Sequence, residues 1–248
     1  MRKIHVLSAF FMLTVWSGSW SNRSTTPNAL TTGVQIGTAA NAEVRWTPNP
    51  NRGSASSSMS GGRRGTPFAA CALDHNQPDP AITLLAPDGQ VNLTAEAQPT
   101  LSWFLETDNI ANMEFVLSDG IGEEPVYVKQ IQSEGGLIEV KLPESAALKA
   151  DTTYRWTVFV ECDGGEYFIH ARSFVALTDN VDAAALSELT PVETANVYAG
   201  RGIWYDALNT LVSAYRQHSE MDTLLAIRSL LQQAETEVPL ELSLATES

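Results

Sequence analysis

The stretch TTYRWTVFVECD, residues 152–163, alternates between two sets of side chains. The set expected to face the core is Tyr154, Trp156, Val158, Val160 and Cys162. The set on the opposite face is Arg155, Thr157, Phe159 and Glu161. A period of two across a segment rich in β-branched and aromatic residues is typical of a β-strand. We therefore predict that this stretch is the central strand of a sandwich core.

Shorter stretches with the same period surround it. The expected inward positions are Leu101, Trp103, Leu105, Met113, Phe115, Leu117, Ile138, Val140 and Leu142. Residues 126–131 are mixed on both faces and predict an edge strand, and Asp163, Gly164 and Gly165 form a hairpin-turn signal. Seven or eight short strands within the 98 residues from Ala81 to Thr178 predict an immunoglobulin/fibronectin-III-like β-sandwich.

The spacing of Leu148, Thr152 and Tyr154 resembles the tyrosine corner of fibronectin type III-like domains, in which a tyrosine hydroxyl bonds back to the chain upstream. Cys162 does not lie two residues after Tyr154, as the antibody-type pattern requires. An inter-sheet disulfide of the immunoglobulin type is therefore not expected.

The C-terminal part carries helix signals. Thr190, Pro191 and Glu193 predict a capped helix start, after a short helix over residues 182–189. Further helices are expected over residues 204–217 and from Ser219 to about residue 235. The positions that fit a tetratricopeptide-like helical hairpin are Ala195, Tyr198, Gly202, Trp204, Ala207, Leu211 and Ala214.

An isolated repeat of this kind cannot bury its own apolar face, so the hairpin is expected to pack on the sandwich or on a partner. Ser219 occupies the position of the motif's final proline, which is a departure. Trp204 and Tyr205 are adjacent on a helix and are not expected to point inward together, so they are candidate partner-binding residues. Packing of both residues in the core is the favoured interpretation.

The first residues predict export. Arg2 and Lys3 precede an apolar run over residues 6–16, and small residues follow at 17–19. This run is too short to span a membrane and indicates a signal peptide over residues 1–19, with an uncleaved anchor as the alternative. No later apolar run approaches membrane length. The mature protein is therefore expected in the periplasm or outside the cell, without an integral membrane segment.

The remaining chain divides by composition into four parts. We predict a disordered Ser/Gly/Pro-rich linker over residues 20–78, the β-sandwich over 79–178, a helical region over 179–236 and a flexible tail over 237–248. An exported chain with two cysteines usually pairs them, which predicts a disulfide between Cys71 and Cys162. A metal half-site formed by Cys71 and His75 is the alternative, but no second half-site has matching spacing.

The charge is unevenly distributed. Residues 1–70 carry seven Lys or Arg and one acidic residue. Residues 71–248 carry eight Lys or Arg and 28 acidic residues. The resulting net charge of -20 over the second part argues against a nucleic-acid partner because phosphates would be repelled.

No catalytic, cofactor or metal motif is recognised. The sequence has no Gly-x-Ser-x-Gly element, and its four histidines show no ligand spacing. Loop acids Glu123, Glu124, Asp163 and Glu166 offer a weak calcium site, although exposed turn acids are the simpler interpretation.

Several motifs together resemble a known family. They are an Arg-Trp-Thr-Pro lead, a Gly-Gly-Arg-Arg-Gly segment, a Pro-x-Leu-x-Trp strand, a Tyr-x-Trp strand and the helix Gly-Ile-Trp-Tyr-Asp-Ala-Leu over residues 202–208. The pattern is similar to a domain-of-unknown-function family, numbered 928, of exported proteins found mainly in cyanobacteria. The resemblance implies an export signal and a β-rich body with C-terminal helices, and it brings no catalytic residues.

A non-enzymatic binding or assembly module of the cell envelope or extracellular space is the function that these features favour, with a protein partner. The alternative is a secreted hydrolase of polysaccharide or peptide that uses an unrecognised carboxylate pair.

Overall fold

In a computed structural model, the stretch with the alternating pattern forms strand β7 (Thr153–Cys162). The structure describes residues 43–48, 80–119, 124–162, 167–179, 181, 183–236 and 238–239. The five side chains predicted to face the core are all buried, so the predicted strand and its facing are confirmed. The Tyr154 hydroxyl accepts a hydrogen bond from the Lys149 N–H at 3.2 Å, which joins the start of the strand to the loop before it.

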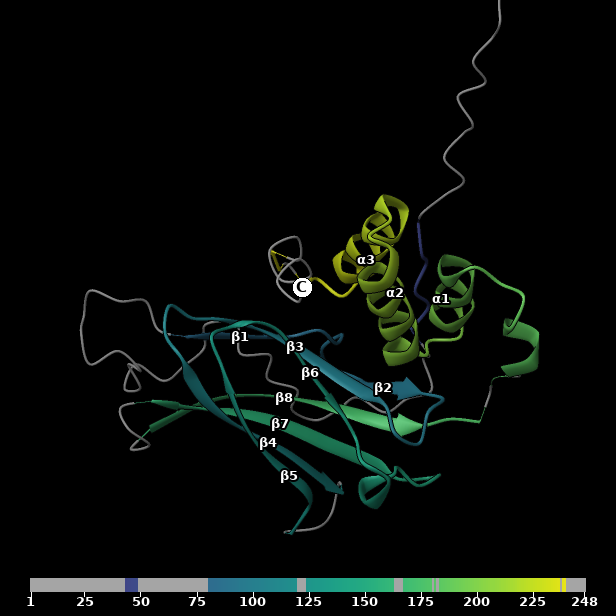
Figure 1. Cartoon of the computed structure of the whole chain (residues 1–248). Helices are drawn as coiled ribbons and strands as arrows, with labels where there is room; N and C mark the ends of the chain where they lie inside the picture. The colour runs from purple at the N-terminus through teal and green to yellow at the C-terminus, as the bar shows by residue number, and fades with distance from the viewer. Residues whose placement is uncertain are drawn as a thin grey trace, which may run out of the picture. The chain divides into compact units, whose positions relative to one another are not determined.

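The strands form two sheets (Figure 1). The three-stranded sheet has the order β1 (Ala81–Leu84), β3 (Thr100–Glu106) and β6 (Gly136–Lys141). The five-stranded sheet has the order β2 (Val91–Thr94), β8 (Tyr167–Leu177), β7, β4 (Ala111–Asp119) and β5 (Pro125–Ser133). β2 pairs with β8 in parallel, and the other pairings are antiparallel. β7 is the middle strand of five, and β5 is an edge strand, as the sequence predicts.

Aromatic rings fill the core. The ring centroid of Trp103 on β3 lies 6.1 Å from that of Phe115 on β4 and 6.4 Å from that of Trp156 on β7. All three side chains are fully buried. Because these strands belong to different sheets, the aromatic cluster joins the two layers, and burial of such large side chains is a main source of stability.

Three helices follow the strands: α1 (Pro191–Gly200), α2 (Trp204–His218) and α3 (Met221–Gln233). The predicted capping box is confirmed at the start of α1. The Glu193 N–H donates to Thr190 Oγ1 at 3.3 Å, and the Thr190 N–H donates to the Glu193 carboxylate at 2.8 Å. The carboxylate bonds lower the pKa of Glu193. Pro191 occupies the first helical position, where its missing N–H costs nothing.

Two helix boundaries differ from the sequence prediction. Residues 182–189 were expected to form a short helix, but only the single 3₁₀ turn η3 (Ala183–Leu186) forms there. Ser219 was expected to cap the third helix, but it ends α2 instead, with a left-handed φ of 52°. The helix α3 begins at Met221 after Glu220 and has no side-chain cap. Ser219 in the left-handed conformation donates its N–H to Tyr215 O and so ends α2. A residue held in this conformation cannot also be the first cap of α3.

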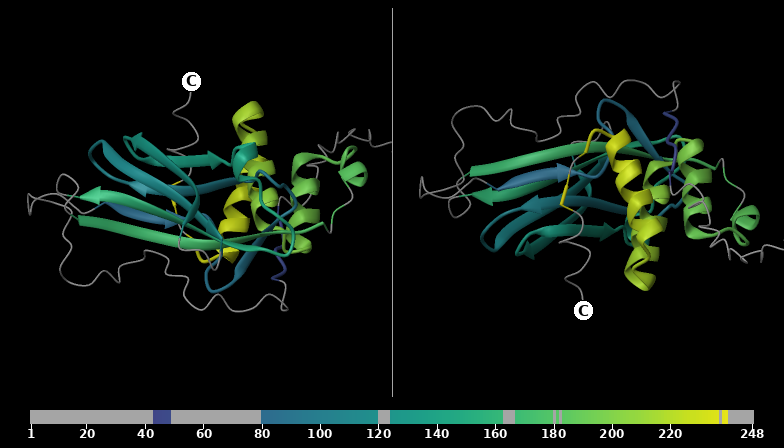
Figure 2. Two further views of the ribbon diagram at one scale, coloured as in Figure 1. Left: turned by 90° about the horizontal axis from the view of Figure 1, so that it is seen from below. Right: turned by 90° about the horizontal axis from the view of Figure 1, so that it is seen from above.

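The helices lie at one end of the sheets, as both views in Figure 2 show, and α2 packs there against β2 and β3. The Asn209 side chain on α2 donates to Thr100 O on β3 at 3.0 Å. Arg216 near the end of α2 forms an ion pair with Glu139 on β6. Another short element, the 3₁₀ turn η1 (Glu144–Ala146), leads from β6 towards β7.

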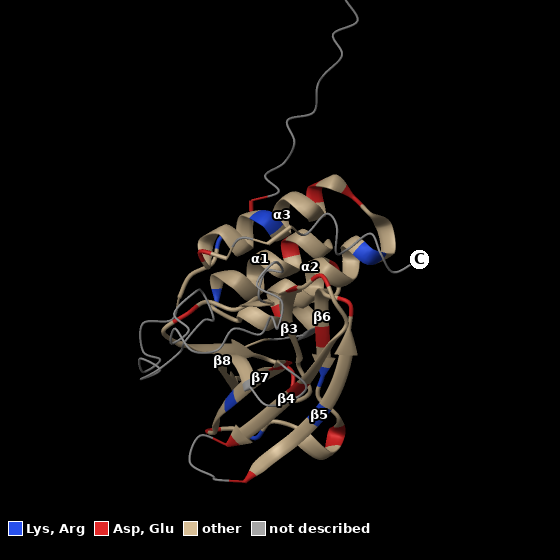
Figure 3. Cartoon of the chain, turned by 90° about the vertical axis from the view of Figure 1, so that its left-hand side faces the viewer, with Lys and Arg blue, Asp and Glu red and all other residues tan. Residues whose placement is uncertain are grey.

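Acidic residues outnumber basic ones in the whole chain by 29 to 15. In the part that the structure describes, acidic positions recur on strands and helices alike (Figure 3). The negative charge is therefore a property of both layers and the helices, which is consistent with a solubility role.

Candidate functional site

Three consecutive residues at the start of α2 attach the helices to the sheets. The Trp204 Nε1–H donates to Leu85 O at 2.7 Å. The Tyr205 hydroxyl accepts from the Trp156 Nε1–H at 2.8 Å and donates to Phe174 O at 3.2 Å. The Asp206 Oδ2 atom accepts from the Ala95 N–H at 3.0 Å. The motif Trp-Tyr-Asp therefore gives α2 a polar contact to the strands from each of its first three residues.

Burial at this junction shapes the chemistry of Tyr205. Its side chain is only 1% exposed, and that burial raises the pKa of its hydroxyl to about 12. Hydrogen bonding by Trp156, Ser173 and Asn92 opposes the shift. Tyr205 therefore stays neutral and serves as a structural donor and acceptor.

The expectation that Trp204 and Tyr205 cannot point inward together is wrong. Both side chains are buried, Trp204 completely. The first turn of α2 lies between the sheets on one side and α1 on the other, so adjacent positions both meet protein. Neither side chain presents a surface to a partner in this arrangement, which agrees with the favoured interpretation of core packing.

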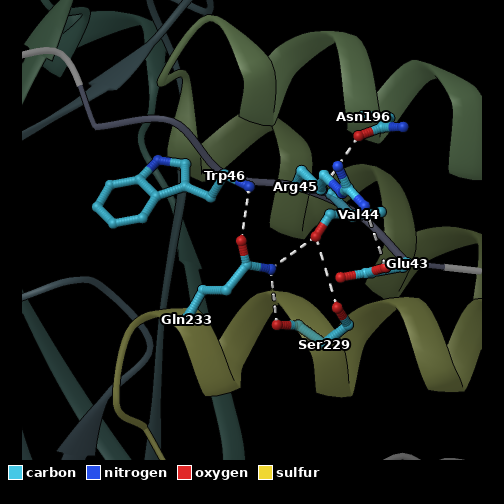
Figure 4. A network of polar contacts seen from close by, with 7 residues as sticks. All are labelled: Glu43, Val44, Arg45, Trp46, Asn196, Ser229 and Gln233. Carbon is cyan, nitrogen blue, oxygen red and sulfur yellow. Dashed lines mark hydrogen bonds and ion pairs between the residues drawn. The ribbon is translucent and has the colours of Figure 1, made fainter.

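A second feature was not foreseen from the sequence. Residues 43–48, within the predicted disordered linker, lie in an extended conformation between α1 and α3 (Figure 1 and Figure 4). The description as a disordered linker does not apply to these six residues. We call them the docked segment.

On its α3 side the docked segment is held mainly by Gln233, and the Ser229 hydroxyl also donates to Val44 O at 3.5 Å (Figure 4). Gln233 Nε2 donates to Val44 O at 2.6 Å, and Gln233 Oε1 accepts from the Trp46 N–H at 2.8 Å. Gln233 Nε2 also donates to Ser229 O at 2.9 Å within α3, which fixes the orientation of the amide. A carbonyl and the N–H two residues later point the same way in an extended chain. Gln233 thus pairs with the segment as a neighbouring strand would.

The other edge of the docked segment is hydrogen-bonded to α1. The Arg45 N–H donates to Asn196 Oδ1 at 3.1 Å, and the Thr47 N–H donates to Ala199 O at 3.0 Å. The N–H groups of residues 45 and 47 lie on the edge opposite to that of residue 46. The docked segment is therefore hydrogen-bonded on both edges. We call the side chains of Asn196 and Gln233 the amide clamp.

Two side chains of the docked segment reach into the protein. Val44 is completely buried, and the Trp46 ring packs edge-on against Trp204 with centroids 5.2 Å apart. Arg45 between them is exposed and forms an ion pair with Glu43 at 3.7 Å. The side chains of the docked segment thus point alternately inward and outward. The Trp46 ring packs on Trp204, the residue that also bonds the start of α2 to Leu85 O.

A small polar cavity of about 240 Å³ is lined by residues of α1, α2 and the strands. Its lining includes Glu96, Lys141, Tyr198, Asp206, Thr210 and Ser213. Asp206 is 5% exposed, and its Oδ1 atom is buried without a hydrogen-bond partner among the described residues. Burial raises the pKa of Asp206 to about 6, and the Glu96 carboxylate acts in the same direction. The Thr94 side chain and the Ala95 N–H oppose that shift.

The other residues that the sequence singles out are placed as follows. Cys162 is buried at the end of β7, whereas Cys71 lies outside the described residues, so their disulfide stays a prediction. Glu123, Asp163 and Glu166 also lie outside them, and Glu124 is exposed beside β5. His75 lies outside the described residues as well. His170 on β8 and His218 at the end of α2 are exposed.

No group of three or more His, Cys, Asp or Glu side chains among the described residues is arranged to hold a metal ion. No helix among them is long and apolar enough to cross a membrane.

Sequence reasoning missed Asn196, Gln233 and the docked segment. Asparagine and glutamine on helices are common, and nothing in their spacing indicates a peptide partner. The one available signal was the Val-x-Trp alternation at residues 44–46 inside an otherwise polar lead. It marks a short extended segment with one inward face.

Comparison with family models gives one match. The model described as Domain of Unknown Function (DUF928) matches residues 59–246. The match covers the strands, the helices and both residues of the amide clamp, and it begins after the docked segment. A search of curated proteins found no match.

A search of solved structures gives astrotactin-2, described as a conserved vertebrate-specific and perforin-like membrane protein involved in neuronal development. The similarity covers 68% of this chain and 36% of that chain, at 14% identity and a TM-score of 0.25. The matched part is thus about a third of the astrotactin-2 chain. A TM-score of this size supports no inference about fold or function.

Proposed function

This chain belongs to the DUF928 family, a domain of unknown function, and we propose that it is an exported, non-enzymatic binding module that holds an extended peptide segment between α1 and α3. The observation that carries the proposal is the amide clamp. Gln233 pairs with Val44 O and the Trp46 N–H, and Asn196 pairs with the Arg45 N–H.

The clamp contacts backbone atoms, which every peptide has. Recognition through main-chain groups supplies affinity with little dependence on sequence, and side-chain contacts then select among segments. Here the selecting contacts are the buried Val44 and the packing of Trp46 on Trp204. The expected ligand is an extended segment with an apolar residue followed two positions later by an aromatic one.

The family boundary supports a role beyond holding this chain's own lead. The family match contains Asn196 and Gln233 but begins at residue 59, after the docked segment. In this chain the segment is tethered to the domain, so a ligand from another molecule must compete with a high effective concentration. The docked segment would therefore act as an internal competitor.

The finer architecture belongs to the same proposal. We regard the body as an immunoglobulin/fibronectin-III-like sandwich, supported by the parallel pairing of β2 with β8 and by the Tyr154 hydrogen bond to Lys149. We regard the helices as a tetratricopeptide-like hairpin plus one helix, supported by the packing of α1 on α2 and of α2 on α3. The proposal includes the export signal predicted from residues 1–19, so that the module would act in the periplasm or outside the cell and assemble there with a protein partner.

A peptide titration tests the proposal. The double variant Val44→Asp, Trp46→Ala in the full chain should weaken the binding of the docked segment to α1 and α3. A carboxylate is costly to bury at position 44, and alanine at position 46 removes the ring contact with Trp204. A labelled peptide with the sequence of residues 41–50 should then bind saturably, measured by fluorescence anisotropy. Gln233→Ala in the same background removes two hydrogen bonds to the peptide and should weaken binding about tenfold.

The chain offers a matched control at the neighbouring position. Gln232 is exposed on α3 and makes none of the contacts to the docked segment, so Gln232→Ala should leave the affinity unchanged. The proposal is wrong if the folded double variant does not bind the peptide, or if the two glutamine variants bind it equally well.

A further inference from the structure

The cavity beside α2 is independent of the amide clamp and contains a carboxylate in an unusual state. Asp206 is 5% exposed, and its Oδ2 atom accepts a hydrogen bond from the Ala95 N–H at 3.0 Å. Hydrogen bonding by the Thr94 side chain also acts to lower the pKa of this carboxyl group. The Oδ1 atom is buried and unpartnered within the described part of the chain. None of the three ion pairs between described residues includes Asp206. A buried acceptor without a donor is expensive, so a ligand that supplies one gains affinity.

The groups around this carboxylate make the inner end of the cavity negative. Glu96, from the turn between β2 and β3, contributes to raising the pKa of Asp206. Burial raises the pKa of the Tyr198 hydroxyl, and Asp206 and then Glu96 add to that effect, so Tyr198 stays neutral. The nearest cation in the lining is Lys141 at the end of β6. Its Nζ lies 3.8 Å from Glu96 Oε2, and both side chains are more than half exposed. Water screens the charge of Lys141, and the Lys141 ammonium therefore does little to neutralise the buried Asp206 carboxylate.

We propose that this cavity binds a primary ammonium group, held by the Asp206 carboxylate, by Glu96 and by the neighbouring hydroxyl groups. An –NH₃⁺ group carries three donors and one positive charge. The lining supplies two carboxylates and the hydroxyls of Tyr198, Thr210 and Ser213 as acceptors.

Other cations fit less well. Calcium takes six to eight oxygen ligands, and the described residues contain no cluster of three acidic, His or Cys side chains. A quaternary ammonium group has no N–H donor and is usually held by several aromatic faces, whereas Tyr198 is the only aromatic residue in the lining. The volume of about 240 Å³ exceeds the ~30 Å³ share of a single water molecule and leaves room for an ammonium group with a short alkyl chain.

The test follows the Ala95 amide in ¹H–¹⁵N spectra of the full chain, since this N–H donates to Asp206. Methylammonium and Nα-acetyl-lysine amide are added at neutral pH, with tetramethylammonium as the control at the same ionic strength. A saturable shift with a primary ammonium, and none with tetramethylammonium, is the expected result. Tighter binding of methylammonium would indicate a free amine as the source, and tighter binding of the lysine derivative would indicate a lysine side chain.

Two variants locate the site. Asp206→Asn should weaken binding at least about tenfold, and Glu96→Gln about threefold, because each loses one negative charge near the ammonium. Glu144→Gln changes the net charge equally at an exposed position outside the cavity and should have no effect. If Asp206→Asn does not fold, the difference in ammonium affinity between Glu96→Gln and Glu144→Gln shows whether the cavity is the binding site. Equal shifts from all three cations, no saturable shift, or equal affinities of those two glutamate variants would overturn the proposal.

Discussion

The hydroxyl of Tyr205 is the single atom on which three elements converge. It accepts from Trp156 on β7, donates to the backbone of β8 and belongs to α2. Because the site is buried, neither the indole N–H nor the carbonyl has water as a substitute partner. The cost of removing this hydroxyl is therefore set by the groups left unpaired.

Tyr205→Phe should lower the free energy of unfolding by about 1–3 kcal/mol, because the Trp156 N–H is left buried without an acceptor. Urea denaturation followed by circular dichroism measures this change. Tyr215→Phe on the same helix is the control, since Tyr215 is only half-buried and makes none of these contacts. A loss no larger than that of the control would show that the hydrogen bond has little structural importance.

The charge of Asp206 depends on the fold, because burial raises the pKa of its carboxyl group. Its pKa of about 6 lies above the ordinary value near 3.9, so the folded chain binds a proton that the unfolded chain releases between these values. The stabilisation from this proton is fully present below about pH 4 and is lost as the pH rises through about 6.

Asp206→Asn removes this titration. The stability of the original chain relative to the variant should therefore fall by up to ~3 kcal/mol between about pH 4 and pH 8. Urea denaturation of both proteins at each pH gives this difference, and the effects of other groups cancel in the comparison. A difference that does not vary with pH would mean that Asp206 titrates normally.

At the scale of elements, the docked segment behaves as a strand whose neighbours are two helices. Its amides at residues 45, 46 and 47 are all hydrogen-bonded, alternately to α1 and α3. Such amides exchange with solvent only when the segment detaches, so their exchange rates report the stability of docking.

Gln233→Ala should speed hydrogen exchange of the Trp46 amide at least about tenfold, because the clamp loses both of its bonds on the α3 side. The measurement is hydrogen–deuterium exchange with NMR detection, and Gln232→Ala is again the matched control. Unchanged exchange at Trp46 in the Gln233 variant would show that Val44 and Trp46 hold the segment without the clamp.

The start of α1 offers a second test. Thr190→Ala removes the side-chain acceptor for the Glu193 N–H and should lower the free energy of unfolding by about 1 kcal/mol. Thermal denaturation measures it, with Ser213→Ala at an exposed position of α2 as a comparison. An unchanged melting temperature would mean that α1 is held by packing alone.

Elements with a strong local pattern were the ones that sequence predicted well. The alternation in β7 and the capping box at Thr190 are written in neighbouring residues, and both are confirmed. The boundary at Ser219 failed because one polar residue suits either the end of α2 or the start of α3. The amide clamp was not predicted, since its partners Gln233 and Trp46 are 187 positions apart. No local pattern records such a pairing.

At the scale of the whole molecule, helices and sheets share one hydrophobic core. The buried cluster runs from Trp103 and Trp156 in the sheets to Trp204 and Leu211 on α2, and it includes Val44. Continuous burial of this kind couples the unfolding of the parts.

We therefore expect a single unfolding transition. Helix content, followed by circular dichroism, and tryptophan fluorescence should give the same denaturation midpoint. Trp204→Leu should lower both midpoints together, because Trp204 lies where the helices meet the sheets. Two separate transitions would show that the helical region is an independent unit.

The separation of Trp46 from Gln233 also fixes an order of events during biogenesis. A ribosome makes the docked segment well before α3, because Trp46 precedes Gln233 by 187 positions. Until α3 is complete, Val44 O and the Trp46 N–H lack their partner Gln233. Docking through Gln233 is therefore possible only in a chain that contains α3, and a chain terminated before α3 would leave the segment more open to proteases.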